Sequence, residues 1–140
     1  MCRAAQAPEA PESLVVFRQG PHMVVLNRYP YNNGHLMVAP LAHVATPEAL
    51  PEADRAGLWE LVLAARQRLA EVYEADGFNL GLNLGEAAGA GLADHLHFHI
   101  VPRWRGDANY LTTTGEVRVI PEDLATTWRR LREAFEDAQD

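Results

Sequence analysis

The stretch His95-Leu-His-Phe-His-Ile-Val-Pro102 places three histidines at alternating positions, followed by two apolar residues and a proline. In a β-strand every second side chain shares a face, so we expect the three imidazoles on one side and Leu96, Phe98 and Ile100 on the other. Leucine, phenylalanine, isoleucine and valine favour a half-buried strand. Pro102 is expected to end regular pairing, because proline has no N–H to donate. The stretch therefore predicts a strand that carries a row of imidazoles.

The composition suits one soluble globular domain. A chain of 140 residues that is 48% hydrophobic can bury a single core. The formal net charge of −7 argues against binding to nucleic acid or to an anionic membrane. The single cysteine, Cys2, permits no internal disulfide, and neither a signal-peptide pattern nor an apolar run of membrane-spanning length is present. We therefore expect a cytoplasmic protein.

Short runs of β-branched and apolar residues predict four more strands, because turn residues bound each run. The runs cover residues 14–18, 23–27, 34–40 and 78–84. Gly20-Pro21 separates the first two runs and predicts a hairpin. Residues 1–13 are small, polar and interrupted by prolines, so we expect a loosely held N-terminal arm before a domain of residues 14–140.

Two segments show helical periodicity. Apolar residues recur at three- and four-residue spacing from Pro47 to about Ala75, which is typical of a long amphipathic helix that covers a sheet. Thr46 is expected to cap this helix and Gly77 to end it. After Pro121 a second apolar stripe predicts a C-terminal helix, and its members are Leu124, Trp128, Leu131 and Phe135.

The histidine row has three interpretations. Satisfied polar residues on a sheet face would need several hydrogen-bond partners for three imidazoles. A metal site could use two of the histidines with a distant third ligand, because the outer pair of the row lie roughly 13 Å apart at strand rise. In covalent catalysis the central imidazole attacks phosphorus while its neighbours hold charge and protons.

Residues 95–101 read H-φ-H-φ-H-φ-φ, where φ is an apolar residue, and this pattern resembles the signature of the histidine triad (HIT) superfamily of nucleotidyl hydrolases and transferases. The segments 27–35, 36–40 and 79–102 are similar to the same superfamily, and the similarity extends over about residues 14–110. The segment LADHLHFHIVPRWRGDANY is most similar in sequence to the bacterial branch that contains diadenosine tetraphosphate phosphorylases, near the fragile histidine triad enzymes.

The resemblance implies an α+β fold of the HIT type, with an antiparallel sheet of about five strands, one long covering helix and a C-terminal helix. It implies that His97 is the nucleophile that attacks the α-phosphorus of a nucleotide. His99 and His35 are expected to line the phosphate site, and His95 to orient its neighbours. Neutral imidazole is plentiful at neutral pH because its ordinary pKa is near 6.5.

The resemblance also implies substrate contacts outside the triad. Asn83 matches a phosphate-contacting position and Asn27 a ribose-contacting position. The glycine-rich loop before the triad can bring backbone N–H groups close to phosphate oxygens. Relatives often carry a polar side chain near Ala90 and Gly91, so backbone contacts are expected there instead. Trp104 is expected either to cover the pocket or to pack within the domain.

Some bacterial members of the superfamily hold a structural zinc ion with a Cys-x-x-Cys pair near the N-terminus, a histidine at the position of His43 and the first triad histidine. Here Ala5 stands three residues after Cys2, so half of the thiolate pair is missing. We therefore expect no metal site and no cofactor beyond magnesium ions on the substrate phosphates. The sequence leaves open whether Cys2 and His43 take part in any zinc site.

The favoured function is phosphorolysis of diadenosine polyphosphates to ADP plus a nucleoside polyphosphate, ATP in the case of the tetraphosphate, with inorganic phosphate as the second substrate. A HIT hydrolase that releases AMP is the alternative, and a zinc-dependent hydrolase and a nucleotide-binding regulator are alternatives of other classes. We expect a homodimer, in which helix aromatics such as Trp59 and Trp128 contact the partner. His22 has no motif around it and is expected at the surface.

Overall fold

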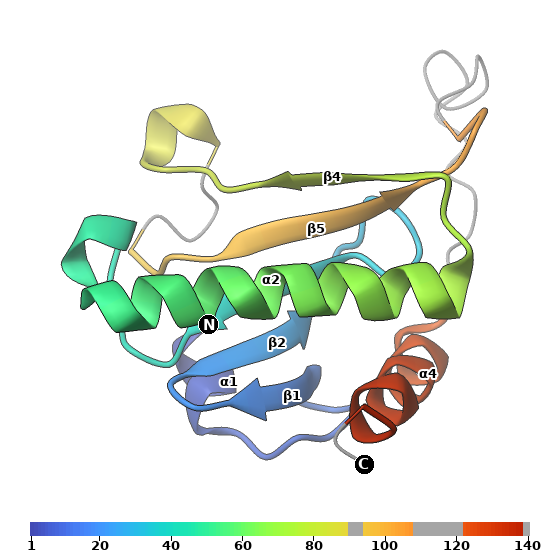
Figure 1. Ribbon diagram of the computed structural model, residues 1–140, viewed down its shortest axis with the longest axis horizontal. Helices are drawn as coiled ribbons and strands as arrows, with labels where there is room; N and C mark the ends of the chain where they lie inside the picture. Colours follow the sequence, from blue (N-terminus) through green and yellow to red (C-terminus); the bar gives the residue numbers. More distant parts are fainter. Residues whose placement is uncertain (90–93, 108–121, 139–140) are drawn as a thin grey trace.

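The computed structural model describes residues 1–89, 94–107 and 122–138, and the α+β fold that it shows confirms the predicted class (Figure 1). Five strands form one antiparallel sheet in the order β1-β2-β3-β5-β4. The strands are β1 (Val15–Gln19), β2 (His22–Leu26), β3 (Leu36–Pro40), β4 (Gly77–Gly81) and β5 (Phe98–Arg103). The helices are α1 (Cys2–Gln6), α2 (Glu52–Tyr73) and α4 (Leu124–Glu136), with 3-10 turns η1 (Pro47–Ala49) and η2 (Glu86–Ala88).

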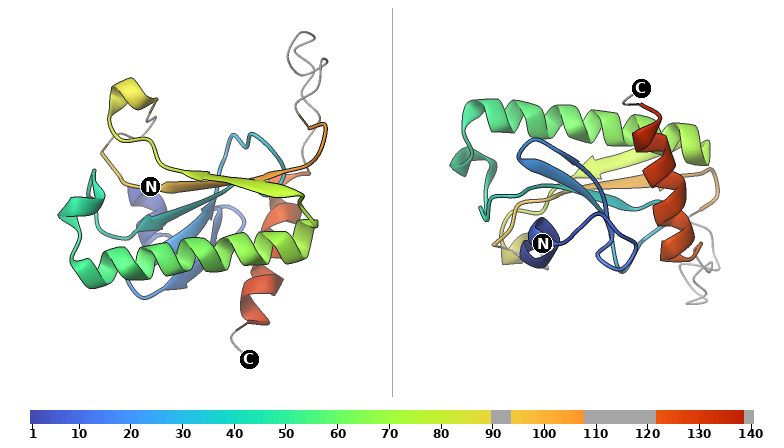
Figure 2. Two further views of the ribbon diagram at one scale, coloured as in Figure 1. Left: turned by 45° about the horizontal axis from the view of Figure 1, so that its top comes forward. Right: turned by 90° about the horizontal axis from the view of Figure 1, so that it is seen from below.

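Helix α2 covers one face of the sheet, as predicted. Its buried side chains contact β2, β3 and β5, and they are Leu58, Leu61, Val62, Ala65 and Leu69. Figure 2 shows α2 on one side of the sheet and α1 on the other. Helix α4 closes the core beside β1, where the rings of Phe17 and Phe135 stack with centroids 4.8 Å apart. The site must therefore be built on the sheet face that α2 leaves free.

The long helix begins later and ends earlier than predicted. Thr46 precedes the separate turn η1, and the extended backbone of Leu50 divides that turn from α2. The cause is Pro51, because a proline disfavours helical conformation in the residue before it. The helix ends at Tyr73, and Glu74 rather than Gly77 takes the left-handed conformation that stops it. Gly77 is instead the first residue of β4.

The C-terminal helix is confirmed. The carboxylate of Asp123 accepts a hydrogen bond from the backbone N–H of Thr126 at 3.0 Å, which is the usual cap of a helix N-terminus. The indole N–H of Trp128 donates to the carbonyl oxygen of Val15 at 2.8 Å. Trp128 is therefore tied to β1 within its own chain.

Strand β5 starts and ends later than predicted. It begins at Phe98, where pairing with Val38 of β3 begins, and it continues through Pro102 to Arg103. Pro102 is tolerated because β3 pairs only as far as Ile100, so beyond that point the neighbour of β5 within the described residues is β4. His95 and His97 thus lie in the extended segment that leads into the strand.

The prediction that His22 is a surface residue is wrong. Its side chain is only 4% exposed, because β2 lies inside the sheet and the imidazole approaches Gly57 of the covering helix. Among the described residues its Nε2 atom has no hydrogen-bond partner. Helix α2 covers His22, and its Gly57 lies 35 residues further along the chain. The sequence around His22 therefore does not predict its burial.

The segment before β1, for which the sequence predicts a loosely held arm, includes α1. The guanidinium group of Arg18 in β1 donates hydrogen bonds to the carbonyl oxygens of Ala4, Ala5 and Ala7. These carbonyl groups lie at the end of α1, where acceptors lack partners within the helix. Arg18 thereby places Cys2 beside the sheet. Within the described residues, no helix is both long and apolar enough to cross a membrane.

We predict that Gly34→Ala lowers the free energy of unfolding by about 2–4 kcal/mol, measured by urea denaturation. Gly34 has a φ of 73°, and a Cβ atom there would approach Leu69 Cδ2 and Tyr73 Cε2 to 2.9 Å. Gly20→Ala is the matched control, because Gly20 has a φ of 53° but open space around the same atom. It should lose only about 1–2 kcal/mol. Equal losses would show that crowding against α2 does not matter.

Candidate active site

Three histidines, in or directly before two neighbouring strands, meet on the sheet face opposite α2. His35 lies directly before β3, His97 directly before β5 and His99 within β5. Nε2 of His35 lies 3.0 Å from Nδ1 of His99, and the rings of His97 and His99 have centroids 4.8 Å apart. Leu96 and Ile100 lie in the core, and Phe98 packs against Trp59 of α2. The predicted alternation between the two faces of the strand therefore holds for His97 and His99.

His95 faces Cys2 of α1, on the side of the sheet away from α2 (Figure 2), so it lies on the predicted side, but its contacts are with His43 and Cys2 rather than with His35 and His99. Its ring lies next to that of His43, with centroids 5.4 Å apart, and its Nε2 donates to the carbonyl oxygen of Pro40 at 2.9 Å. The reason is that the chain at His95 has not yet entered β5 and instead crosses the end of β3. Its role as an orienting residue fits this position.

The hydrogen bond of His97 fixes the location of its proton. Nδ1 of His97 lies 2.8 Å from the carbonyl oxygen of His95, and a carbonyl oxygen can only accept. Nδ1 therefore carries the proton. In the neutral ring the lone pair of Nε2 is then free, and that atom can act as a nucleophile.

Burial keeps the neighbouring imidazoles neutral. His35 is 1% exposed, and burial, followed by the charges of His99 and His97, lowers its pKa to about 4. Burial and then the charge of His97 also lower the pKa of His99. Both effects disfavour the charged form. At neutral pH His35 and His99 are therefore neutral.

The loop from Asn27 to Gly34 borders the histidines. The backbone N–H of Asn27 donates to the carbonyl oxygen of His35, and its side-chain oxygen accepts from the N–H of Tyr29. The structure therefore brings Asn27 to the site. Tyr31 is 76% exposed, yet its ring centroid lies 4.7 Å from that of His35. Sequence reasoning missed Tyr31, although an aromatic residue so close before Gly34-His35 was a usable signal.

Two other predicted residues follow β4 and β5, and Gly81, two residues before Asn83, pairs with His99 of β5. Asn83 is exposed just before η2, beside Gly89. Trp104 lies beyond the end of β5, where its N–H donates to the carbonyl oxygen of Tyr73 at the end of α2. Its position there is that of a packing residue, and contact with substrate stays a prediction. Ala90 and Gly91 lie outside the described residues.

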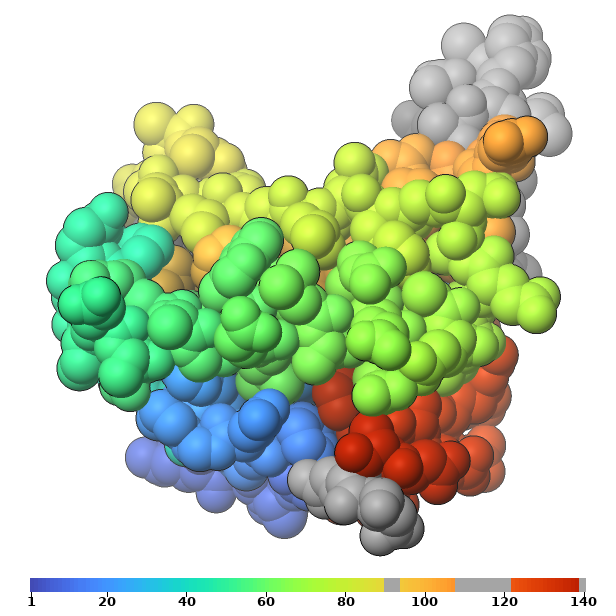
Figure 3. Space-filling model, in the orientation of Figure 1, coloured from blue at the N-terminus to red at the C-terminus, as the bar shows by residue number. Residues whose placement is uncertain are grey.

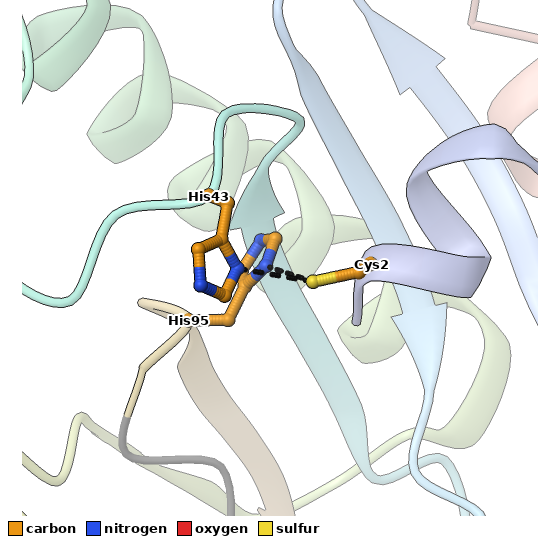
Figure 4. Close-up of side chains that lie close together, drawn as sticks. All are labelled: Cys2, His43 and His95. Carbon is orange, nitrogen blue, oxygen red and sulfur yellow. Dashed lines mark hydrogen bonds between the residues drawn. The ribbon is translucent and has the colours of Figure 1, made fainter.

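Cys2, His43 and His95 form a second cluster, shown in Figure 4. The Sγ atom of Cys2 lies 3.0 Å from Nδ1 of His43 and 3.5 Å from Nδ1 of His95. One ligand atom from each residue lies within 4.8 Å of the others. Because Nε2 of His95 donates to a carbonyl oxygen, its Nδ1 lone pair faces the sulfur, as in a metal-ligating histidine. The three residues fit a zinc ion, while Ala5 supplies no fourth ligand.

The comparison with protein families agrees with this geometry. A family model described as the HIT domain matches residues 8–106. The chain belongs to the HIT family. The AP-4-A phosphorylase of Mycobacterium tuberculosis is 48% identical over 120 residues, which are 86% of this chain and 62% of that protein. The chain thus spans less than two thirds of the length of this HIT relative.

Solved HIT structures share the fold. A histidine triad nucleotide-binding protein from Sulfolobus tokodaii superposes with a TM-score of 0.74 at 27% identity, over 90% of this chain and 85% of that one. A Zn-bound histidine triad family protein from Mycobacterium smegmatis superposes with a TM-score of 0.70 at 27% identity, over 99% of this chain and 93% of that one.

We predict that the free energy of unfolding falls as the pH is lowered from 6.5 to 4, in part because of His35. Its pKa is about 4 in the folded protein and near 6.5 in the unfolded chain, so the unfolded state binds more protons across this range. The contribution is at most about 3 kcal/mol. His35→Gln cannot titrate, so urea denaturation at several pH values should show a shallower dependence. An unchanged slope would mean that His35 titrates normally in the folded protein.

Proposed function

We propose that this protein cleaves diadenosine polyphosphates through a covalent nucleotidyl intermediate on His97. The observation that carries the proposal is the hydrogen bond from Nδ1 of His97 to the carbonyl oxygen of His95, since it leaves Nε2 as a free nucleophile. The adjacent ring of His99 supplies a second imidazole within reach of the same phosphate.

The reaction proceeds in two displacements. The lone pair of His97 Nε2 forms a bond to the α-phosphorus, and the bond from that phosphorus to the bridging oxygen breaks. The departing polyphosphate keeps the electron pair, and His99 is placed to stabilise its oxygen. Water or inorganic phosphate then attacks the same phosphorus, and the P–N bond breaks to restore the neutral imidazole. An attacking water or hydrogen phosphate releases its proton to the solvent.

The favoured substrate is diadenosine tetraphosphate, and the favoured acceptor is inorganic phosphate. Support comes from the AP-4-A phosphorylase, which shares 48% identity with this chain. Attack by phosphate on the adenylyl group gives ADP, and the departing group is ATP. Attack by water would give AMP and ATP. Magnesium ions on the substrate phosphates would balance their charge, as the protein itself has a formal net charge of −7.

Residues around the histidines are proposed to hold the substrate. Asn27 would bind the ribose and Asn83 a phosphate. Backbone N–H groups of the glycine-rich segment before the triad would bind further phosphate oxygens, with Ala90 and Gly91 leaving room for the second anion. Trp104 would limit access of water at the far end of β5.

A zinc ion, if bound, would be held by Cys2, His43 and His95. The relative from M. smegmatis, described as Zn-bound, supports this possibility. The ion would supply a structural link between α1 and the segment before β5, and with three protein ligands its site would be open to exchange. A zinc-dependent hydrolysis is less favoured, because His97 and His99 lie outside this cluster.

We also propose that two copies pair through the edge strand β4. Among the strands that the structure describes, β4 lies at one edge of the sheet, and such an edge is a template for another chain. Leu80 is 39% exposed on β4, and Trp59 and Leu63 are exposed on α2. Figure 3 shows the surfaces of α2 and β4 side by side. A second copy would cover this apolar surface.

We predict that His97→Gly folds and loses activity by at least about 10³-fold, because no other group can replace the nucleophile. Added imidazole should restore part of the turnover by occupying the vacated space. Rates with diadenosine tetraphosphate measure both effects. Imidazole added to the wild-type protein is the control and should not stimulate it. A variant that keeps most of its rate without imidazole would remove His97 from the mechanism.

The second displacement is tested by product identification. With diadenosine tetraphosphate and millimolar inorganic phosphate, we expect ADP and ATP, because phosphate competes for the adenylyl group. Omission of phosphate should slow turnover and shift the product to AMP. Formation of AMP and ATP at the same rate under both conditions would identify a hydrolase and contradict phosphorolysis.

We predict a mass of twice the 15.5 kDa chain by light scattering at micromolar concentration. Leu80→Asp should give a monomer, because it places a charge in the proposed β4 interface. Gln19→Asp is the matched control, since Gln19 is exposed on β1 at the opposite edge of the sheet. A monomeric wild-type protein, or a dimer that survives Leu80→Asp but not Gln19→Asp, would overturn this interface.

A further inference from the structure

Tyr31 is an exposed aromatic residue beside the histidines of the candidate site. Its side chain is 76% exposed, although aromatic rings usually bury much of their surface on folding. The ring lies against that of His35, with centroids 4.7 Å apart and 41° between the planes. The ring of His99 has its centroid 6.4 Å away and a plane tilted by only 23°. Tyr31 therefore presents most of its ring to solvent at the edge of the histidine cluster.

The backbone that carries this ring is fixed on both sides. The N–H of Tyr31 donates to Nδ1 of His35 at 3.1 Å. The side-chain amide of the next residue, Asn32, donates to the carbonyl oxygen of Pro102 at 3.2 Å and to the carboxylate of Asp107 at 2.9 Å. A ligand that binds to the ring therefore does not have to order the loop, and such preorganisation favours affinity.

An open aromatic ring on a fixed loop suits a flat, polarisable ligand. Nucleobases stack on tyrosine rings, and the contact requires no opposite charge on the protein. This suits a chain with a formal net charge of −7. In the proposed reaction the substrate carries two bases, one on the adenylyl group and one on the departing nucleotide.

The position of Tyr31 favours the departing half of the substrate. Asn27, which is proposed to bind the ribose of the adenylyl group, has its side-chain amide 3.4 Å from Nε2 of His35, whereas Tyr31 donates to Nδ1 of the same ring. The two residues thus approach His35 at different nitrogens. His99, which is placed to stabilise the departing oxygen, has its ring beside that of Tyr31.

We propose that the ring of Tyr31 stacks on the nucleobase of the departing nucleotide and so favours dinucleoside polyphosphates over substrates with a single nucleoside. This role rests on the proposed cleavage of dinucleoside polyphosphates. Stacking tolerates any base, because every base has a π-face. The site therefore selects for the presence of a second base rather than for its identity.

A comparison of two substrates tests this selectivity. Adenosine 5′-tetraphosphate has the same α-phosphorus as diadenosine tetraphosphate and a triphosphate leaving group, but it has no second nucleoside. Tyr31→Ala should lower the ratio of kcat/KM for the dinucleotide to that for the mononucleotide on the order of 10-fold, mainly through KM for the dinucleotide. Tyr31→Phe keeps the ring and should keep the ratio. An equal loss with both substrates in Tyr31→Ala would overturn the proposal.

Tyr29 provides a matched control in the same loop. Its side chain is 77% exposed, but within the described residues the ring contacts with His35 and His99 are those of Tyr31. Tyr29→Ala should therefore keep the wild-type ratio, and an equal fall in this variant would overturn the assignment to Tyr31. Light scattering should give one mass for the wild type and both variants. A changed mass in Tyr31→Ala would instead identify its ring as a contact between copies.

NMR tests the stacking without turnover. His97→Gly lacks the proposed nucleophile, so diadenosine tetraphosphate should stay intact on this variant. We expect nuclear Overhauser effects between adenine protons and the ring protons of Tyr31, assigned by adding Tyr31→Phe. A bound dinucleotide without these contacts, or no binding, would overturn the proposal. If the contacts are present but the wild-type protein cleaves no dinucleotide, the proposed function fails and the base-binding role of Tyr31 stands.

Discussion

The hydrogen bond from Nδ1 of His97 to the carbonyl oxygen of His95 determines what the histidine cluster can do. An imidazole has one proton to place when neutral, and this bond assigns it to the nitrogen that faces the backbone. The lone pair of the opposite nitrogen is then free without any general base.

The backbone geometry that holds His97 is a long-range product of the fold. The N–H of Leu96 donates to the carbonyl oxygen of Val44, and Nε2 of His95 donates to that of Pro40, so the segment before β5 is bound to the end of β3 and the loop after it. Cys2 lies against the same segment because Arg18 holds α1 in place. The N-terminus, the loop after β3 and the segment of His95 therefore support the position of His97 together.

The sequence predicts the parts of this arrangement that depend on local periodicity. The alternation of residues 96–100 correctly places His97 and His99 on one face, and the spacing of apolar residues correctly predicts α2 and α4. It does not predict that β5 begins only at Phe98, because that depends on where β3 ends its pairing. The burial of His22 under α2 and the contact of His95 with Cys2 of α1 likewise depend on segments distant in sequence. The apolar spacing did not predict the separate turn η1 before α2, because Pro51 interrupts an otherwise continuous helical pattern.

The central claim is that the proton on Nδ1 of His97 leaves Nε2 as the attacking atom. The most direct measurement is ³¹P and ¹⁵N NMR of the adenylyl-enzyme trapped by rapid alkaline quench of the ¹⁵N-histidine-labelled protein with diadenosine tetraphosphate, because the P–N bond is stable in alkali. The account predicts one phosphoramidate, with phosphorus coupled to Nε2 of His97. Phosphorus on Nδ1 of His97, or on His99 or His35, would contradict it.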